Sequence, residues 1–252
     1  MINGLYTATA GMAMQQRRVD VVASNLANIN TTGHKKEIAV FSQYLPNATE
    51  TPNDFIRNSE YNKTINSKVR LHDIKTSFEM GYLKETGKSL DMALGNPKAF
   101  FPVDTPFGVR FTRDGAFTLN DQNELITMDG YKLVSNVESL QAVRLPEDAV
   151  ITETGDILVD GAQVGAIDIV EFESMENIQK QGRNLYVAVD TLPVPSEQPK
   201  LYTGYLEGSN VNPIDEMVKM IEASRGFENY SKIIHTIQEM DSKAAGEVGK
   251  VS

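Results

Sequence analysis

The chain contains few side chains of the types that perform catalysis or hold transition metals. It has 252 residues, no cysteine and three histidines, which lie far apart at His34, His72 and His235. Without cysteine there is no disulfide, no thiolate nucleophile and no cysteine-ligated zinc or iron–sulfur site. No spacing places a nucleophile beside a base. The sequence therefore predicts no catalytic residue, no metal site and no cofactor.

A group of charged residues in the middle of the chain is better explained by turns than by an active site. Arg113, Asp121, Glu124 and Asp129 could be drawn as a catalytic group. Asp-Gly pairs nearby are typical of hairpin turns, however. Residues 120–124 resemble a calcium loop only superficially, because the required glycine and terminal glutamate are missing. We expect Arg113 to be a structural or interface residue that pairs with a carboxylate.

The charge balance excludes two classes of partner. The chain has 24 Lys and Arg against 34 Asp and Glu, a net charge of −10. A general nucleic-acid binder needs a basic surface to neutralise phosphates, and binding to an anionic membrane surface needs a polybasic segment. No apolar run approaches the roughly 20 residues that span a bilayer. The first residues also lack the features of a cleaved secretory signal. We expect no nucleic-acid partner and no direct membrane insertion.

The N-terminal segment, residues 1–36, has the pattern of a long helix. Apolar or small residues recur at spacings of three and four, as in a coiled-coil seam that is broken once, at Gln15. They are Leu5, Ala8, Met12, Val19, Val22, Leu26 and Ile29. The pattern predicts a helix from about residue 3 to residue 30. Gly33 suits the left-handed position that follows a helix end.

The C-terminal segment, residues 206–252, predicts a second long helix. Asn212 and Pro213 are typical of the N-cap and the first helical position, and acidic residues follow in the first turn. Gly226 in mid-helix costs about 1 kcal/mol relative to alanine, which is tolerable if a neighbour packs closely. The helix has a wide apolar face made of Met217, Met220, Ile221, Phe227, Tyr230, Ile233, Ile234, Ile237 and Met240.

The middle of the chain, residues 70–205, predicts short β-strands separated by turn signals. Residues 157–164 are typical of a hairpin with a type I′ turn. Short strands at close spacing favour an antiparallel sandwich or barrel-like module. Residues 37–69 form a polar, extended linker or loop. The predicted fold class is therefore α+β, with long terminal helices that form a coiled-coil-like layer and a central β-rich domain.

The apolar faces of the two helices exceed what one pair of helices can bury. Burying a Leu, Ile or Phe side chain contributes roughly 1.5–3 kcal/mol, so exposing several is costly. Residues 1–36 carry four basic side chains and one acidic, whereas residues 205–245 carry four basic and seven acidic. We therefore expect the helices to pack against other copies. The predicted interface residues are Leu5, Met12, Val19, Val22, Asn25, Leu26, Asn28, Ile29, Met217, Met220, Ile221, Phe227, Tyr230, Ile234 and Ile237.

Three blocks of sequence together resemble the bacterial flagellar rod and hook protein family. The first runs through residues 4–12 and 24–36, which include Asn-Leu-Ala-Asn, a Thr-Gly turn and a basic pair. The second runs from residue 89 to residue 131 and includes Phe-Thr-Arg-Asp-Gly-Ala-Phe. The third runs from residue 204 to Asp241. The blocks occur in family order and span nearly the whole chain, and their spacing is most similar to a proximal rod protein, with the distal rod protein as the rival.

This resemblance implies a structural subunit of the flagellar basal-body rod. Such proteins pass unfolded through the flagellar type III export channel, without a cleaved signal, and polymerise helically beneath the hook. The terminal helices would form the inner tube around the channel, and the β-domain would face outward. The implied partners are copies of the chain, other rod proteins and the export apparatus, in a basal body that spans the periplasm. From another class, a surface-binding or adhesin module on a helical stalk remains open, although stalks usually run continuously rather than from both chain ends.

Overall fold

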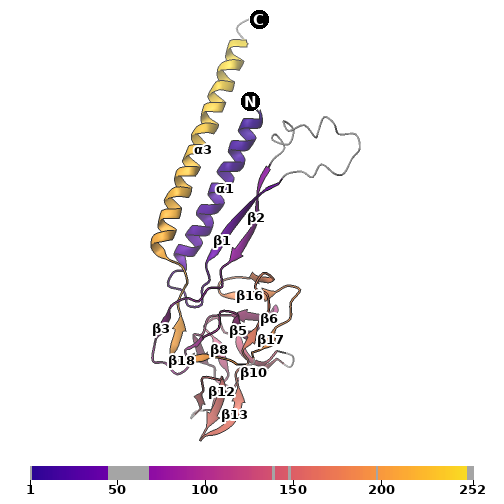
Figure 1. Cartoon of the computed structure of the whole chain (residues 1–252), viewed down its shortest axis with the longest axis vertical. Helices are drawn as coiled ribbons and strands as arrows, with labels where there is room; N and C mark the ends of the chain where they lie inside the picture. The colour runs from indigo at the N-terminus through magenta and orange to yellow at the C-terminus, as the bar shows by residue number, and fades with distance from the viewer. Residues whose placement is uncertain (1, 45–67, 138–139, 147–148, 197, 249–252) are drawn as a thin grey trace, which may run out of the picture. The chain divides into compact units, whose positions relative to one another are not determined.

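The computed structural model describes residues 2–44, 68–137, 140–146, 149–196 and 198–248 (Figure 1). The chain forms two compact units. The helical unit consists of Met1–Leu26, Glu37–Lys75 and Asn212–Ser252, and the β unit consists of Ala27–Lys36 and Thr76–Val211. Most of the predicted linker, residues 45–67, lies outside the described residues. Both units are therefore assembled from segments that are far apart in the sequence.

The first helix, α1, runs from Ile2 to Ala27, three residues short of the predicted end. The chain turns immediately afterwards, because the Thr31 amide donates to the Asn28 carbonyl at 3.1 Å. Gly33 then adopts the predicted left-handed conformation, with φ of 67°. The glycine therefore belongs to the turn that follows the helix, and not to its last residues.

The second helix, α3, runs from Pro213 to Val248. The predicted cap is confirmed, since the Asn212 side-chain oxygen accepts a hydrogen bond from the Ile214 amide at 3.0 Å. Asp215 and Glu216 stand in the first turn, where the helix dipole favours negative charge. Local sequence signals therefore fix the start of this helix.

Within the helical unit, α1 and α3 lie side by side and run antiparallel (Figure 1). A Cβ added at Gly11 would lie 2.4 Å from the ring of Tyr230, and one added at Gly226 would lie 2.8 Å from the Gln15 side chain. Asn25 bonds Glu216. In each of these pairs the two residue numbers add to 241, so one register holds along the helix pair. Small residues at the contacts let the larger side chain opposite pack closely.

A two-stranded sheet completes the helical unit. It pairs β1, from Glu37 to Tyr44, with β2, from Lys68 to Thr76. The Arg18 guanidinium of α1 lies 5.2 Å from the centre of the Phe41 ring in β1. A cation over an aromatic face is attracted to it, so this contact links the sheet to α1.

The β unit is built from short antiparallel strands, as predicted. Its largest sheet has the order β15-β16-β6-β5-β9-β8-β7, with β10 paired to β9, β14 to β5 and β17 to β14. Three smaller sheets have the orders β11-β12-β13, β18-β4 and β19-β3. The strands of the β unit are β3 (Leu83–Glu85), β4 (Met92–Leu94), β5 (Ala99–Thr105), β6 (Gly108–Thr112), β7 (Phe117–Leu119), β8 (Leu125–Thr127), β9 (Lys132–Asn136), β10 (Gln141–Ala142), β11 (Val150–Ile151), β12 (Asp156–Val159), β13 (Ala162–Ala166), β14 (Val170–Glu171), β15 (Ile178–Lys180), β16 (Leu185–Ala188), β17 (Val194–Pro195), β18 (Leu201–Thr203) and β19 (Tyr205–Glu207).

The predicted hairpin is confirmed in its turn type. Asp160 and Gly161, which join β12 to β13, have φ angles of 51° and 82°. Two successive positive φ angles define a type I′ turn, whose twist matches that of the flanking strands. By contrast, the sequence pattern did not identify β5, the strand from Ala99 to Thr105. Its run of apolar residues does not alternate and contains Pro102, a residue that usually argues against a central strand.

Strand β5 supplies both parts of the core. Phe101 and Val103 belong to one cluster with Leu125, Leu133 and Ile157. Phe100 belongs to a second cluster, which is rich in aromatic rings and includes Phe78, Phe111, Phe172 and Tyr186. Successive side chains of a strand point to opposite faces. A strand that is buried on both faces therefore needs apolar residues at successive positions.

Candidate assembly surface and buried ion cluster

The predicted interface residues of α3 divide between two faces of the helix. Met220, Phe227, Tyr230, Ile234 and Ile237 are half-buried and follow one another at spacings of seven, three, four and three residues, which keeps them on one side of the helix. The contacts of Tyr230 with Gly11 and of Ile237 with Gly4 show that this face packs on α1. These five residues therefore complete the helix pair within one chain.

Met217 and Ile221 lie on a different, exposed face. Together with Ile214 and Val218 they form four large apolar side chains within eight residues, each 51–71% exposed. We call these four residues the α3 patch. Single exposed apolar residues are normal, but a contiguous group of them is typical of a surface that binds another protein.

The predicted interface residues of α1 and the turn after it are mostly covered within the folded chain. Leu5, Met12, Val19 and Leu26, seven residues apart, are half-buried. Val22 is buried. The last two predicted residues, Asn28 and Ile29, are half-buried and belong to the β unit. The predicted set is therefore shared between the helical unit and the β unit.

Asn25 is used inside the chain. Its amide group donates to the Glu37 carbonyl at 2.9 Å, and its oxygen accepts from the Glu37 amide at 2.9 Å. The same amide donates to the Glu216 carboxylate, 191 residues away, at 3.2 Å. Both Asn25 and Glu216 are buried, and Glu216 also accepts from Lys219. A buried polar side chain needs such partners, so Asn25 holds α1, the start of β1 and the start of α3 together.

The β unit contains a fully buried group of three charged side chains, which we call the ion cluster. The Glu207 carboxylate accepts from Lys35 Nζ at 2.6 Å and from Arg113 Nη2 at 2.6 Å and Nε at 2.9 Å. Each of these three side chains is at most 1% exposed. The expectation that Arg113 pairs with a carboxylate is confirmed. The two-point contact of a guanidinium with a carboxylate is among the strongest hydrogen-bonded arrangements in proteins.

Other hydrogen-bonding groups of the ion cluster also have partners. Arg113 Nη1 donates to the carbonyls of Asn96 and Ala99, both at 2.6 Å. Lys35 Nζ donates to the Glu79 carbonyl at 2.7 Å. A buried ion pair is tolerated only when its other donors and acceptors are satisfied in this way.

The backbone around the ion cluster joins the two ends of the β unit. The Gly33 amide donates to the Glu207 carbonyl at 2.8 Å. Beside it, the Lys36 amide donates to the Asn210 side chain at 2.7 Å, and the Thr32 hydroxyl donates to Asp114 at 2.7 Å. The turn after α1 and the strand before α3 are therefore bonded to each other and to the middle of the chain.

Electrostatics favour the charged form of Glu207. Burial alone would raise the pKa of this carboxyl, but Arg113, Lys35 and the Gly81 amide hold its pKa below the ordinary value. Burial and the neighbouring Arg113 lower the pKa of Lys35 to about 8, although Glu207 opposes this shift. One carboxylate thus compensates two buried cations, and its removal would leave both without a counter-charge.

His34, the residue before Lys35 of the ion cluster, is a buried titratable side chain. It is fully buried, and neither ring nitrogen has a hydrogen-bond partner among the described residues. Burial and the nearby Lys180 lower its pKa to about 4, from an ordinary value of 6.5. Below pH 6.5 the unfolded chain therefore binds a proton that the folded chain does not. Folding stability should fall as the pH drops from about 6.5 to 4.

We expect His34→Leu to reduce this acid sensitivity. The loss in the free energy of unfolding between pH 7 and pH 5 should be smaller by roughly 2 kcal/mol in the variant, because leucine does not titrate. Urea unfolding followed by circular dichroism at both pH values measures the difference. Equal losses in the variant and the parent chain would show that His34 is not the responsible group.

The charged residues considered for an enzyme site do not come together. Arg113 is in the ion cluster, whereas Glu124 pairs with Lys132 at 2.9 Å and Arg144 at 3.5 Å. Hydrogen bonds from Asn120 and Lys132 lower the pKa of Glu124. Asp121 and Asp129 are exposed. The sequence analysis favoured the turn interpretation over an active site, and the scattered positions of these residues agree with it.

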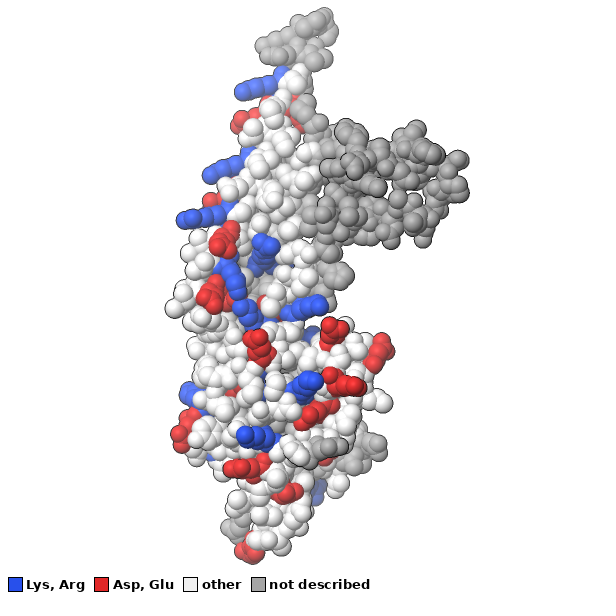
Figure 2. Space-filling model, viewed as in Figure 1, with Lys and Arg blue, Asp and Glu red and all other residues white. Residues whose placement is uncertain are grey.

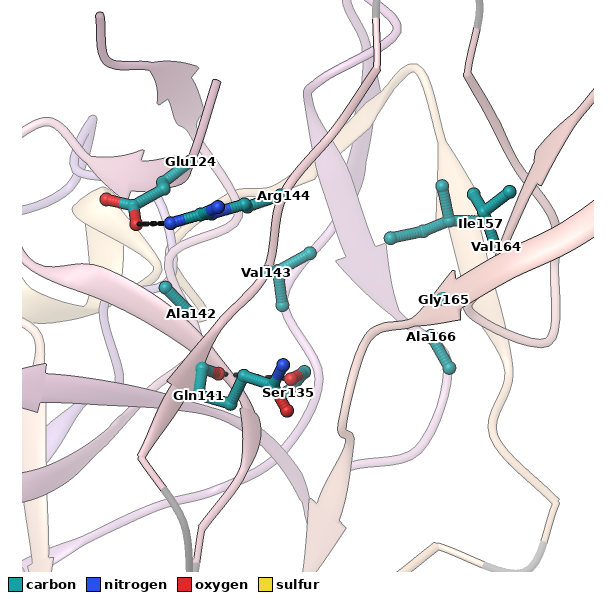
Figure 3. Close-up of a pocket in the computed structure, with 10 residues that line it drawn as sticks. All are labelled: Glu124, Ser135, Gln141, Ala142, Val143, Arg144, Ile157, Val164, Gly165 and Ala166. Carbon is teal, nitrogen blue, oxygen red and sulfur yellow. Dashed lines mark hydrogen bonds and ion pairs between the residues drawn. The ribbon is translucent and has the colours of Figure 1, made fainter. Parts of the chain in front are cut away.

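A hollow of about 490 Å³ in the β unit contains the Glu124–Arg144 pair at one side (Figure 3). Figure 3 shows the aliphatic side chains of Val143, Ile157 and Val164 lining another part of it, with the polar residues Ser135 and Gln141 also at its wall. The Glu124 carboxylate pairs with Arg144 and Lys132, and the Ser135 hydroxyl donates to the Gln141 carbonyl at 3.0 Å, so the two groups are not paired as base and nucleophile. Across the described ranges, no group of three or more His, Asp or Glu residues is placed to hold a metal ion.

On one face of the molecule, basic and acidic side chains are interspersed and do not form separate patches (Figure 2). This face therefore has no broad basic field of the kind that nucleic acids require. Neither α1 nor α3 is long and apolar enough to cross a bilayer, and the same holds for the rest of the described chain.

Three protein families match separate parts of the chain. Residues 5–35 match the family described as flagella basal body rod protein. Residues 96–163 match the D1 domain of the flagellar hook proteins FlgE, FlgF and FlgG. Residues 202–247 match the C-terminal family of the flagellar basal body rod proteins FlgE, FlgF and FlgG. The ion cluster takes one residue from each match: Lys35, Arg113 and Glu207.

Individual relatives align over nearly the full length. The chain is 32% identical to the flagellar hook-basal body complex protein FlhO of Bacillus subtilis, with all of both chains covered. It is 30% identical to the flagellar basal-body rod protein FlgG of Buchnera aphidicola, over 96% of this chain and 98% of the relative. It is also 30% identical to the flagellar basal-body rod protein FlgF of Caulobacter vibrioides, with all of both chains covered.

Proposed function

Because the chain belongs to the bacterial flagellar basal-body rod and hook protein family, we propose that it builds the rod by packing against copies of itself through its terminal helices. The chain is a structural protein of the flagellar basal body and not an enzyme. It assembles with other rod and hook proteins of the basal body. What we propose is the contact that it uses, between the terminal helices of neighbouring copies.

The α3 patch is the observation that carries the proposal. Ile214, Met217, Val218 and Ile221 lie at the start of α3, on the side of the helix that faces away from α1. A helix that is apolar on two faces can complete one contact within its own chain and another with a neighbour. When the two surfaces that meet differ and the rotation does not close, the product is a helical filament. The half-buried predicted residues of α1 and of the α1-facing side of α3 would support the patch by holding the helix pair together, and Asn28 and Ile29 would add contacts from the β unit.

The proposal also covers the place of the chain within the rod and the way it gets there. The helices would line the inner tube around the export channel, with the β unit outside, after export of the unfolded chain by the flagellar type III apparatus. The assembled rod would span the periplasm. The length of the chain, and the short distance between its N-terminal and central blocks, favour the proximal rod. The distal rod is the alternative.

We expect Ile221→Asp to prevent assembly while the chain stays folded. The substitution places a charge in the α3 patch but not in the α1–α3 contact. Sedimentation velocity at rising concentration should show a shift of at least about tenfold in the concentration needed for association, the size of effect expected at a central interface residue. Circular dichroism should remain unchanged.

The matched control is Leu192→Asp, which charges an 85% exposed leucine of the β unit. It should associate like the parent chain. Association that survives Ile221→Asp but is lost with Leu192→Asp would favour the competing idea of a β-domain binding module on a helical stalk.

A further inference from the structure

We propose that Met217 is a modification site at which peroxide oxidation blocks assembly. The chain contains no cysteine, so its ten methionines are the sulfur groups that a peroxide can reach. Met217 is 51% exposed at the centre of the α3 patch. This inference rests on the proposed function, because the effect arises from the role of the patch in self-association.

The reaction requires only a peroxide and an accessible thioether. The Met217 sulfur attacks one oxygen of hydrogen peroxide, the O–O bond breaks, and the oxygen remains on sulfur as a sulfoxide while water leaves. Sulfur is oxidised and the peroxide is reduced. The product is polar and branched, whereas the thioether is apolar and flexible.

The position of Met217 makes this change consequential. Its neighbours in the patch, Ile214, Val218 and Ile221, are all apolar and exposed. A sulfoxide oxygen covered by another copy would lose water and find an apolar surface. Burying a polar group without a hydrogen-bond partner is costly. Oxidation should therefore weaken association without disturbing the α1–α3 contact, which lies on the other side of the helix.

Other methionines provide the comparison. Met92 is fully buried in the β unit and should resist oxidation, whereas Met128 is 75% exposed at the turn between β8 and β9 and should react readily. Met128 lies outside the patch. Leucine replaces methionine at either exposed position with little change in volume and no oxidisable sulfur.

The experiment compares the full chain with Met217→Leu and Met128→Leu, before and after treatment with hydrogen peroxide. Mass spectrometry locates each sulfoxide, and sedimentation velocity measures the concentration at which half of the chain associates. After oxidation we expect that concentration to rise at least about tenfold in the parent chain and in Met128→Leu. In Met217→Leu it should stay within about twofold, and methionine sulfoxide reductase should restore the parent chain.

Two results would overturn the inference about Met217 and leave the proposed function standing. One is normal association of a chain shown to carry the Met217 sulfoxide, and the other is equal sensitivity of Met217→Leu and the parent chain. If the untreated parent chain did not associate at any concentration, the proposed function would fail first and this inference with it. Unchanged circular dichroism after oxidation separates loss of association from loss of folding.

Discussion

Glu207→Gln is expected to lower the stability of the β unit by about 3–5 kcal/mol, the cost of leaving buried charges without their partner. Glutamine keeps the shape of the side chain but cannot neutralise Lys35 and Arg113, both of which are at most 1% exposed. For a unit of this size, the loss corresponds to a decrease of about 10 °C in melting temperature. Thermal unfolding at pH 7, followed by circular dichroism, measures it.

The matched control is Glu124→Gln. The Glu124 carboxylate is also an acceptor for two cations, but Lys132 and Arg144 are exposed and remain hydrated when it is lost. This substitution should have a much smaller effect, since ion pairs with exposed partners contribute little. Equal melting temperatures for the two variants would contradict the role assigned to the ion cluster.

The effect of Glu207→Gln should also depend on pH. Because the pKa of Glu207 is lower in the folded chain than in the unfolded chain, its contribution is fully present above the ordinary value of 4.5. It is lost as the pH falls through the lowered pKa of the folded state. The difference in stability between the variant and the parent chain should therefore narrow at acidic pH.

Gly33→Ala is expected to destabilise the β unit by about 3 kcal/mol, from backbone strain and steric overlap together. Gly33 has φ of 67°, and an added Cβ would lie 2.5 Å from the backbone carbonyl carbon of Arg113 and from the Asp114 nitrogen. Backbone atoms cannot swing aside as the end of a side chain can. Urea unfolding of the full chain measures the loss.

Gly161→Ala separates the two causes. Gly161 also has a positive φ, of 82°, but a Cβ there would meet no described atom within 4 Å. Its substitution should cost only about 1 kcal/mol, the price of the left-handed conformation alone. Equal losses at the two positions would show that the close approach of the Arg113 backbone to Gly33 contributes nothing.

Much of the helical unit could be predicted because its signals are local. The cap at Asn212 and the apolar spacing of both helices depend on residues only a few positions apart. The type I′ turn at Asp160 and Gly161 is equally local. The alternation pattern could not identify strand β5, because a strand buried on both faces shows no alternation of apolar and polar residues.

The division of the apolar residues between faces could not be predicted. The sequence indicated a surplus of apolar surface on the C-terminal helix, but not which residues α1 covers. The structure places Phe227, Tyr230, Ile234 and Ile237 on the α1 side and leaves Met217 and Ile221 exposed. The choice depends on the register of the helix pair, which small residues such as Gly11 set by allowing close approach.

The two terminal helices, the short antiparallel strands between them and the family resemblance could all be inferred from the sequence alone, since each depends on patterns of neighbouring residues. The meeting of Lys35, Arg113 and Glu207 in one buried ion cluster is visible only in the folded chain. Glu207 lies 172 residues from Lys35 and 94 from Arg113. A charged residue carries no local sign of a partner at such distances, because the pairing arises only when the chain folds and removes these groups from water.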